Sequence, residues 1–163
     1  AGGIAPMNRF VAQIFPPSGV TAPPQLSFFC NQAPLGGRTI ATSDLKNYGP
    51  VYKIARENTY TEYQLQFIIT NAWEARNFFI RWMDFCIPTE SANMRYFNDY
   101  KGEIKVLAFD QSNETVSEND ARTGTKYMNT FPINVDAVTL GWDTNNTLGQ
   151  FNVNFACHKW TTI

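Results

Sequence analysis

The feature of the sequence that most limits its fold is an alternation of apolar and polar residues with the period of a β-strand. Near the C-terminus, the apolar face consists of Phe151, Val153, Phe155 and Cys157, and the polar face of Gln150, Asn152, Asn154 and His158. A second segment directs Tyr63, Leu65, Phe67 and Ile69 inward, and Glu62, Gln64 and Gln66 outward. Because successive strand residues point to opposite faces, this pattern predicts antiparallel strands with one face on a core and the other in water.

Similar but shorter segments occur at 9–15, 26–31, 51–55, 103–109 and 126–131. Together with the two above they make about seven strands, a number typical of an antiparallel β-sandwich or barrel. The chain has 163 residues, which is close to the usual size of one domain. The sequence therefore predicts a mainly β fold in a single domain over 1–163.

One segment, 72–86, has the period of a helix instead. Its apolar positions recur every three or four residues, at Ala75, Phe79, Trp82, Met83 and Cys86. Asn71 is a suitable residue to cap the start, and Pro88 prevents the helix from continuing. Because charged residues largely occupy the opposite side, we expect this helix to pack on the β core rather than on a membrane surface or a cofactor.

Composition and charge exclude several classes of function. The 13 basic and 14 acidic residues give a formal net charge of −1, whereas a sequence-specific nucleic-acid reader needs a concentrated basic face. No apolar run approaches the ~20 residues of a membrane-spanning helix, and the first residues lack the pattern of a signal peptide, so neither a bilayer role nor secretion is expected. Cys30, Cys86 and Cys157 are odd in number and far apart, which predicts buried thiols in a reducing compartment rather than disulfides.

Candidate catalytic and metal-binding residues are few. His158 is the only histidine, and its neighbour Cys157 points to the opposite face of the same strand, so the two cannot act as a dyad. The sequence contains no phosphate-binding glycine loop and no metal ligands at the usual spacing, and the polar loop 110–126 lacks the pattern of a calcium loop. We therefore expect no enzyme activity, no cofactor and no metal.

The segment 35–51 is long for a connection. Among its glycines and polar residues it carries four large apolar side chains, Leu35, Ile40, Leu45 and Tyr48. Two interpretations are open: a loop folded back on its own core, or an arm that lies on a neighbouring subunit. The second places these four residues at a subunit interface, together with Ile4 of an N-terminal arm over 1–8 that is flexible until an adjacent subunit pins it.

Four stretches, in order along the chain, carry a family resemblance. They are Phe28-Phe29-Cys30 followed by Ala33-Pro34-Leu35-Gly36; Thr59-Tyr60-Thr61-Glu62-Tyr63; Glu74-Ala75-Arg76 with Phe79 and Trp82; and Phe131-Pro132-Ile133-Asn134-Val135 followed by Leu140-Gly141-Trp142-Asp143 and Asn145-Asn146. In this order and at this spacing, the chain from Asn8 to Trp160 resembles the tail tube proteins of contractile-tailed (myovirus-type) bacteriophages.

The resemblance implies two packed antiparallel sheets with one flanking helix, and a core signature of Phe79, Trp82, Pro132 and Trp142. It also implies homohexameric rings that stack into a hollow tube. The implied partners are the tail sheath, the tape-measure protein, and the baseplate and tail-terminator proteins, with genome DNA passing non-specifically through the lumen. The protein would belong to the virion and assemble in the cytoplasm of the bacterial host. The loop 110–126 is long for the family.

Alternatives remain at this point. The polar face of Glu62, Gln64 and Gln66 is expected in water, either in the lumen or outside, because strand parity does not distinguish the two. The chain is a repeated tube subunit, a baseplate tube initiator, or the inner-tube protein of another contractile injection system. An alternative from a different class is a monomeric carbohydrate-binding β-sandwich with a tryptophan as stacking platform, which would be Trp73, Trp142 or Trp160.

Overall fold

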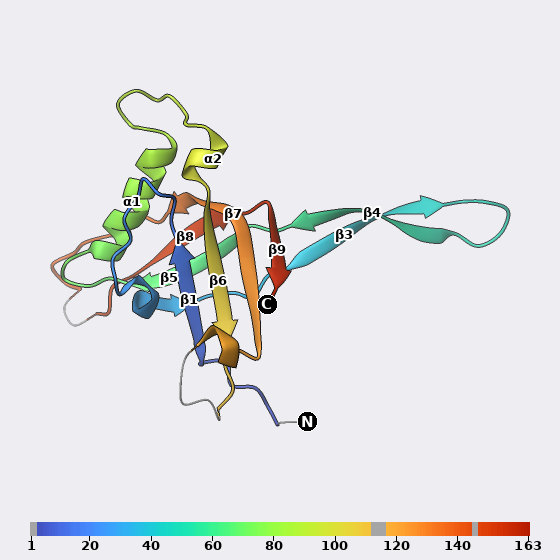
Figure 1. The fold of residues 1–163 in the computed structure, drawn as a ribbon, viewed down its shortest axis with the longest axis horizontal. Helices are drawn as coiled ribbons and strands as arrows, with labels where there is room; N and C mark the ends of the chain where they lie inside the picture. The colour runs from blue at the N-terminus through green and yellow to red at the C-terminus, as the bar shows by residue number, and fades with distance from the viewer. Residues whose placement is uncertain (1–2, 112–116, 145–146) are drawn as a thin grey trace.

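Two antiparallel sheets that share one long strand form the body of the molecule, and a two-stranded hairpin projects from it (Figure 1). The computed structural model describes residues 3–111, 117–144 and 147–163. The strands are β1 (Phe10–Phe15), β2 (Cys30–Gln32), β3 (Arg38–Leu45), β4 (Tyr52–Tyr60), β5 (Tyr63–Ile68), β6 (Gly102–Ala108), β7 (Thr123–Val135), β8 (Gln150–Ala156) and β9 (Lys159–Thr162). The helices are α1 (Glu74–Cys86) and α2 (Phe97–Tyr100), with short 3-10 helices η1 (Leu26–Phe29) and η2 (Glu118–Asp120).

The pairing of the strands wraps the sheets around one core. Sheet A contains β1, β6, β7 and β9, and sheet B contains β7, β8, β5 and β2, with every pair antiparallel. The two sheets together form a nearly closed barrel. It stays open between its outer strands, β1 and β2, which do not pair with each other. The expected mainly β fold, with two antiparallel sheets and a flanking helix, is confirmed.

β7 passes from one sheet to the other at a bend near Asn129. Its first part pairs with β6 and β9, and its last part pairs with β8. The register with β6 shifts between Gly102 and Ile104, which marks a bulge. Asn129 has a φ of 53°, a left-handed conformation that asparagine adopts more readily than most residues. One continuous backbone therefore belongs to both sheets.

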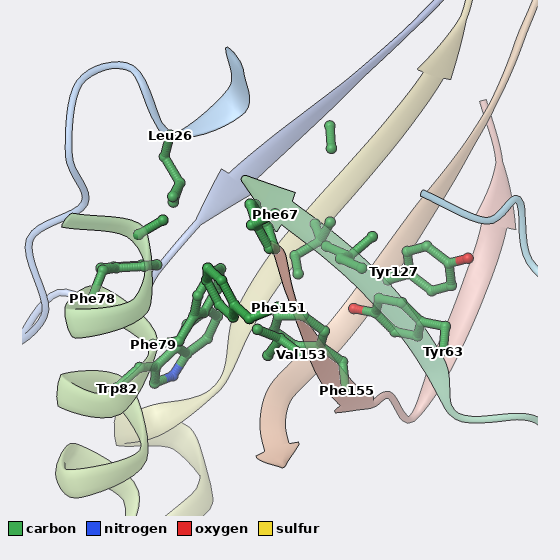
Figure 2. Packing of buried hydrophobic residues seen from close by; sticks show 14 of the residues in the cluster. Leu26, Tyr63, Phe67, Phe78, Phe79, Trp82, Tyr127, Phe151, Val153 and Phe155 are labelled. Carbon is green, nitrogen blue, oxygen red and sulfur yellow. The ribbon is translucent and has the colours of Figure 1, made fainter. Parts of the chain in front are cut away.

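The core is built largely from aromatic rings. Figure 2 shows Phe79 and Trp82 of α1 pointing toward the side chains of β8, and the Phe78 ring packs against both of them. All three are fully buried, and the Phe79 ring lies 5.7 Å from that of Phe155, centroid to centroid. Each such side chain contributes about 2–3 kcal/mol when removed from water, so this face holds the helix on the sheets. The predicted apolar stripe of the helix is confirmed, except that Met83 is only half-buried and Phe78 was not expected in it.

The hydroxyl groups inside the core have hydrogen-bond partners. The Thr130 hydroxyl donates to the Ala156 carbonyl at 2.8 Å, and the Tyr63 hydroxyl lies 2.6 Å from Thr130 Oγ1. The Tyr127 hydroxyl donates to the Pro34 carbonyl at 2.9 Å, and the rings of Tyr63 and Tyr127 stack with centroids 3.7 Å apart. Because a buried hydroxyl without a partner is costly, these bonds help to fix β5 against β7.

Two expectations about local structure differ from what the chain does. The strand expected at 26–31 begins as η1, because the Pro23 carbonyl accepts from the Leu26 amide at 3.2 Å and starts a turn. The helix expected from residue 72 begins at Glu74, and Asn71 does not cap it. Its cap residue is Trp73, whose amide donates to the Thr70 carbonyl and whose φ is 55°.

Two segments expected as loops contain regular structure. Most of 35–51 belongs to the hairpin, because β3 begins at Arg38 and pairs with β4 along its length. The polar loop 110–126 ends earlier than expected, since η2 lies within it and β7 begins at Thr123. Residues 112–116 of this loop lie outside the described residues, as do Gly2 of the N-terminal arm and Asn145-Asn146 of the family signature.

Candidate assembly surfaces

The hairpin of β3 and β4 leaves the body as a separate two-stranded sheet (Figure 1). Trp160 of β9 holds its base. The indole nitrogen of Trp160 donates to the Gly37 carbonyl at 3.0 Å, and its ring meets Tyr60 edge-on at a centroid distance of 6.2 Å. Beyond the base nearly every side chain of the hairpin is exposed. The interpretation of 35–51 as a loop folded back on its own core is therefore wrong.

The outer part of the hairpin has one apolar face and one charged face. Leu45 pairs with Tyr52, and Ile54 lies two residues further along β4, so these three side chains share a face, called here the hairpin face. Asp44 and Lys53 pair on the opposite face. All three side chains of the hairpin face are exposed. A two-stranded hairpin cannot bury a face within itself, so an apolar face of this kind needs a partner from elsewhere.

The five residues expected at a subunit interface do not form one patch. Leu45 belongs to the hairpin face, and Tyr48 lies in the turn between β3 and β4 with its side chain 108% exposed. Ile40 shares a strand face with Asp44, opposite the hairpin face. Leu35 precedes β3, and Ile4 lies in the N-terminal arm, at a different part of the molecule from the hairpin tip (Figure 1). All five are exposed.

Sheet B turns polar side chains away from the core. Along β5, Tyr63, Leu65 and Phe67 are buried, while Gln64 and Gln66 point to the other face. This is the alternation that the sequence predicts. Glu62 lies just before β5 and is exposed as well.

The register of sheet B collects several uncharged amides on this outward side. Gln64 lies opposite Asn154 and Gln66 opposite Asn152, and the Asn31 side-chain amide donates to Gln66 Oε1 at 3.0 Å. We call these five residues the amide face. The alternation within each strand is visible in the sequence. The pairing of β5 with β8 is not visible there, because it joins segments more than 80 residues apart.

The connection from β7 to β8 carries large apolar side chains into solvent. Leu140, Trp142 and Leu148 are all exposed, Trp142 at 106%. The expectation that Trp142 belongs to the core is wrong. Residues 136–144 form no helix or strand, so nothing directs the indole onto a sheet. The other expected core residues, Phe79, Trp82 and Pro132, are buried.

Trp73 lies beside this connection in an unusual conformation. Its φ of 55° is in the left-handed region, which bulky residues rarely adopt. Together with Ile69, Val138 and Leu140 it forms the apolar part of a cavity of about 440 Å³, whose other walls are mainly threonines, Asn71 and Gln150. We call Trp73, Leu140, Trp142 and Leu148 the tryptophan surface. From the sequence, Trp73 and Trp142 are expected only as alternative stacking platforms for a carbohydrate, although two leucines and a tryptophan in a stretch rich in glycine and threonine are a signal for an apolar surface.

Of the three cysteines expected to be buried, Cys86 is buried, whereas Cys30 and Cys157 are only half-buried. Burial raises the pKa of the Cys30 thiol to about 12 and that of Cys86 to about 11, and it also raises the pKa of Cys157. His158 is exposed and stacks on Phe97 with ring centroids 4.5 Å apart. Within residues 3–111, 117–144 and 147–163, no group of three or more His, Cys, Asp or Glu is placed to hold a metal ion. Over the same residues no helix is long and apolar enough to cross a membrane.

The chain matches a known protein family over nearly its whole length. The family model described as phage tail tube protein matches residues 5–163. The chain belongs to the phage tail tube protein family. The resemblance noted in the sequence is thereby confirmed, and the protein is a structural component of a phage tail rather than an enzyme. No curated protein matches the sequence significantly.

Chains with the same fold occur in solved structures of a tube terminating cap, a baseplate and a sheath–tube complex. A chain in the structure of the anti-feeding prophage (AFP) tube terminating cap has a TM-score of 0.70 at 12% identity, covering 100% of this chain and 93% of that one. A chain in the AFP baseplate structure has a TM-score of 0.68 at 11% identity, covering 100% and 97%. A chain in the PVC sheath–tube complex of an extracellular contractile injection system has a TM-score of 0.65 at 12% identity, covering 98% and 91%. At these identities the likeness shows a common fold.

Proposed function

We propose that six copies of the chain form a ring and that such rings stack into the hollow inner tube of a contractile tail. The observation that carries the proposal is the hairpin face, an apolar face of Leu45, Tyr52 and Ile54 that projects from the body and has no partner among the described residues. A tail tube protein must contact its own copies to build a tube. Burial of this face against a neighbour would gain about 25 cal/mol per Å² of apolar area.

The other residues expected at an interface fit contacts with further neighbours. In a stack of rings each copy touches copies beside it, above it and below it. Tyr48 extends the hairpin face into the turn, whereas Ile40, Leu35 and Ile4 lie on other exposed parts of the chain. We assign these three to contacts with different neighbours from the one that meets the hairpin face.

For the lumen we propose the amide face, together with Glu62. A conduit that must release DNA should not hold it, and amides lack the positive charge with which Lys and Arg bind phosphates. Sheets from six copies placed side by side would also cover the unpaired edges of β1 and β2, which would otherwise favour aggregation. On this proposal the genome passes over a wall of amides and carboxylates that carries no positive charge.

The proposed partners are the sheath around the tube, the tape-measure protein within it, and the baseplate and tail-terminator proteins at its ends. The fold is shared with chains from sheath–tube, baseplate and cap structures, which supports such contacts. Assembly would take place in the cytoplasm of the bacterial host, and the product would be part of the virion tail.

A second candidate is a baseplate tube initiator or the inner tube of another contractile injection system. It is supported by fold likeness to the chains from the AFP cap and baseplate, which have TM-scores of 0.70 and 0.68. We prefer the repeated tail tube subunit because the family model that spans residues 5–163 is that of the tail tube protein. Electron microscopy of the purified protein separates the two: long tubes without sheath support the repeated subunit, isolated rings support an initiator, and a protein that stays monomeric when concentrated contradicts both.

The variant Leu45→Asp tests the role of the hairpin face. A charge that becomes buried without a partner at a subunit contact costs several kcal/mol, so we expect folded monomers that no longer form tubes. Ser91→Asp is the control, because it adds the same charge to an exposed residue outside the hairpin. Tubes of normal length from Leu45→Asp, or an equal loss from Ser91→Asp, would contradict the assignment.

A further inference from the structure

We infer that the tryptophan surface of one copy receives the hairpin face of the next copy. This inference rests on the proposed function, because it names the other half of the contact that the hairpin makes. The occupant of the surface is thus a second copy of this chain, and the contact joins two different parts of the same molecule.

The tryptophan surface has the properties of a binding site for an apolar partner. Trp142 and Leu140 stand in solvent beside the cavity that Trp73 lines. Tryptophan is among the residues that contribute most to protein interfaces, because it buries a large rigid area. The left-handed backbone of Trp73 is strained, and strain of this kind gathers at functional sites. The hairpin face offers apolar side chains of matching character in Leu45, Tyr52 and Ile54.

The charges of the hairpin and of the connection between β7 and β8 are complementary. The hairpin, residues 38–60, carries four basic and two acidic residues. The connection that bears most of the tryptophan surface, residues 136–149, carries two acidic residues, Asp136 and Asp143, and no basic one. Glu74, directly after Trp73, adds a further exposed carboxylate. The basic element and the acidic element therefore attract each other, and they select this pairing over contact between two hairpins.

The hairpin and the connection between β7 and β8 are placed so that the same contact can repeat from one copy to the next. The hairpin forms one end of the long axis of the molecule, and the connection between β7 and β8 lies toward the opposite end, beside α1 (Figure 1). A contact between different ends of identical chains is heterologous, so each copy receives one hairpin and offers another. Contacts of this type extend from copy to copy, as the building of a ring or a stack requires.

A second cavity, of about 460 Å³ and lined mainly by apolar residues, fits the charge of the hairpin less well. Ile87, Met94 and Phe131 line it in part, near the end of α1. Asp84 also lines it, and the next cavity along the surface is lined by Asp84 together with Arg81 and Arg95. This mixture of charges does not favour a basic partner over an acidic one. The connection that carries Leu140 and Trp142 has acidic but no basic residues, which favours a basic partner there.

Cross-linking between copies tests the pairing directly. Two single-cysteine versions of the chain, made in a background with Cys30, Cys86 and Cys157 replaced by Ser, carry Tyr52→Cys and Trp142→Cys respectively. They are mixed, assembled into tubes at a concentration well above the threshold expected for a chain without Trp142, and treated with a short bismaleimide. Because neighbouring sites have millimolar effective concentrations, we expect dimers to form at least about tenfold faster in this mixture than in a mixture of Thr42→Cys with Trp142→Cys.

A second variant avoids the altered cysteine background. Trp142→Ala removes a fully exposed side chain, so the monomer should fold as before, and we expect the concentration needed for tube formation to rise at least about tenfold. Tyr96→Ala, at another exposed aromatic residue, should leave that concentration unchanged. Tubes that form normally from Trp142→Ala, or that show no preference for the Tyr52–Trp142 cross-link, would overturn the inference and leave the proposed function intact. A wild-type protein that never assembles would overturn both.

Discussion

Gly102, the first residue of β6, shows how closely the body packs around a single backbone position. A Cβ added there would lie 2.6 Å from the Trp82 ring and 2.8 Å from the Phe15 carbonyl oxygen. Trp82 has no room to retreat, because it is fully buried and its indole nitrogen donates to the Tyr100 carbonyl at 2.9 Å. Helix α1 can therefore pack on the sheets as it does only because Gly102 has no side chain.

The variant Gly102→Ala should lower the free energy of unfolding by about 1–3 kcal/mol, the usual cost of forcing a methyl group into a filled core. Urea denaturation followed by tryptophan fluorescence measures the change. Gly37→Ala is the control, since a Cβ at that residue meets nothing closer than Thr61 Oγ1 at 3.5 Å. A stability of Gly102→Ala equal to that of Gly37→Ala would show that the core around Trp82 is looser than described.

The thiols of Cys30 and Cys86 make the free energy of unfolding depend on pH. In the unfolded chain a cysteine loses its proton near its ordinary pKa of 9.0, whereas burial raises the pKa of Cys86 to about 11 and that of Cys30 to about 12. Above pH 9 the folded state therefore holds more protons than the unfolded state. The sign of the linkage is then negative, and stability falls as pH rises, by up to about 1.4 kcal/mol per pH unit for each thiol.

We expect the free energy of unfolding to decrease between about pH 9 and pH 11, where unfolded and folded thiols differ in protonation. Tyr63, whose pKa burial also raises, adds to the decrease at the upper end of this range. Urea denaturation at a series of pH values measures it. Replacing Cys30 and Cys86 by Ala should make the decrease shallower, although it also removes buried atoms. An unchanged slope in that variant would rule out the thiols as the cause.

Among the elements, the hairpin is the one whose removal the body should tolerate. β3 and β4 pair only with each other, and their contact with the body is confined to the base at Trp160. Replacing residues 42–55 by a short Gly-Ser turn should leave the free energy of unfolding of the monomer within about 0.5 kcal/mol of wild type and abolish tube formation. Urea denaturation checks the stability, and electron microscopy of the same preparation checks tube formation. Tubes built by the shortened chain, or a large loss of stability, would contradict the separation of roles.

Elements with a clear local pattern could be predicted from the sequence. The alternation along β5 and β8 correctly predicts which side chains are buried, and the stripe through Phe79 and Trp82 correctly predicts the helix. These predictions succeed because a strand or helix with one apolar face has only one way to bury it. The family resemblance added the two-sheet architecture.

Features that depend on distant residues could not be predicted in this way. Most of 35–51 was expected as a loop, because β3 has no buried face and hence no clear alternation. Trp142 was assigned to the core from the family signature, yet it lies in a connection without a sheet to pack on. The tryptophan surface also depends on the backbone of Trp73, whose left-handed conformation is set by the turn before α1. Exposed apolar residues of this kind are explained by partners that a single chain does not contain.

At the scale of the whole molecule, the proposed lumen gives a prediction about cargo. Lysine at Gln64 and Gln66 would place positive charge on the amide face without disturbing the buried face of β5. We expect the double variant to form tubes that bind DNA at least about tenfold more tightly than wild type at low salt, with the gain lost as salt rises. Co-sedimentation of tubes with a labelled oligonucleotide measures the binding.

Two controls accompany this measurement. The same positions changed to Ser should give tubes without added DNA binding, and Asn93→Lys places a positive charge on an exposed part of the surface distant in sequence from β5. Failure of the double lysine variant to assemble would mean that the amide face is packed in the tube rather than open to the lumen.

The shared strand β7 has a mechanical consequence. Because a single covalent backbone runs through both sheets, with the bend at Asn129 inside it, a pull on one sheet passes straight to the other and the two cannot slide apart without breaking strand pairs on β7. The joints between copies have no covalent link of this kind and are softer by comparison. A tail built from this chain should therefore flex or shear between its subunits while every subunit keeps its shape, so that the bore stays constant when the tail is driven forward.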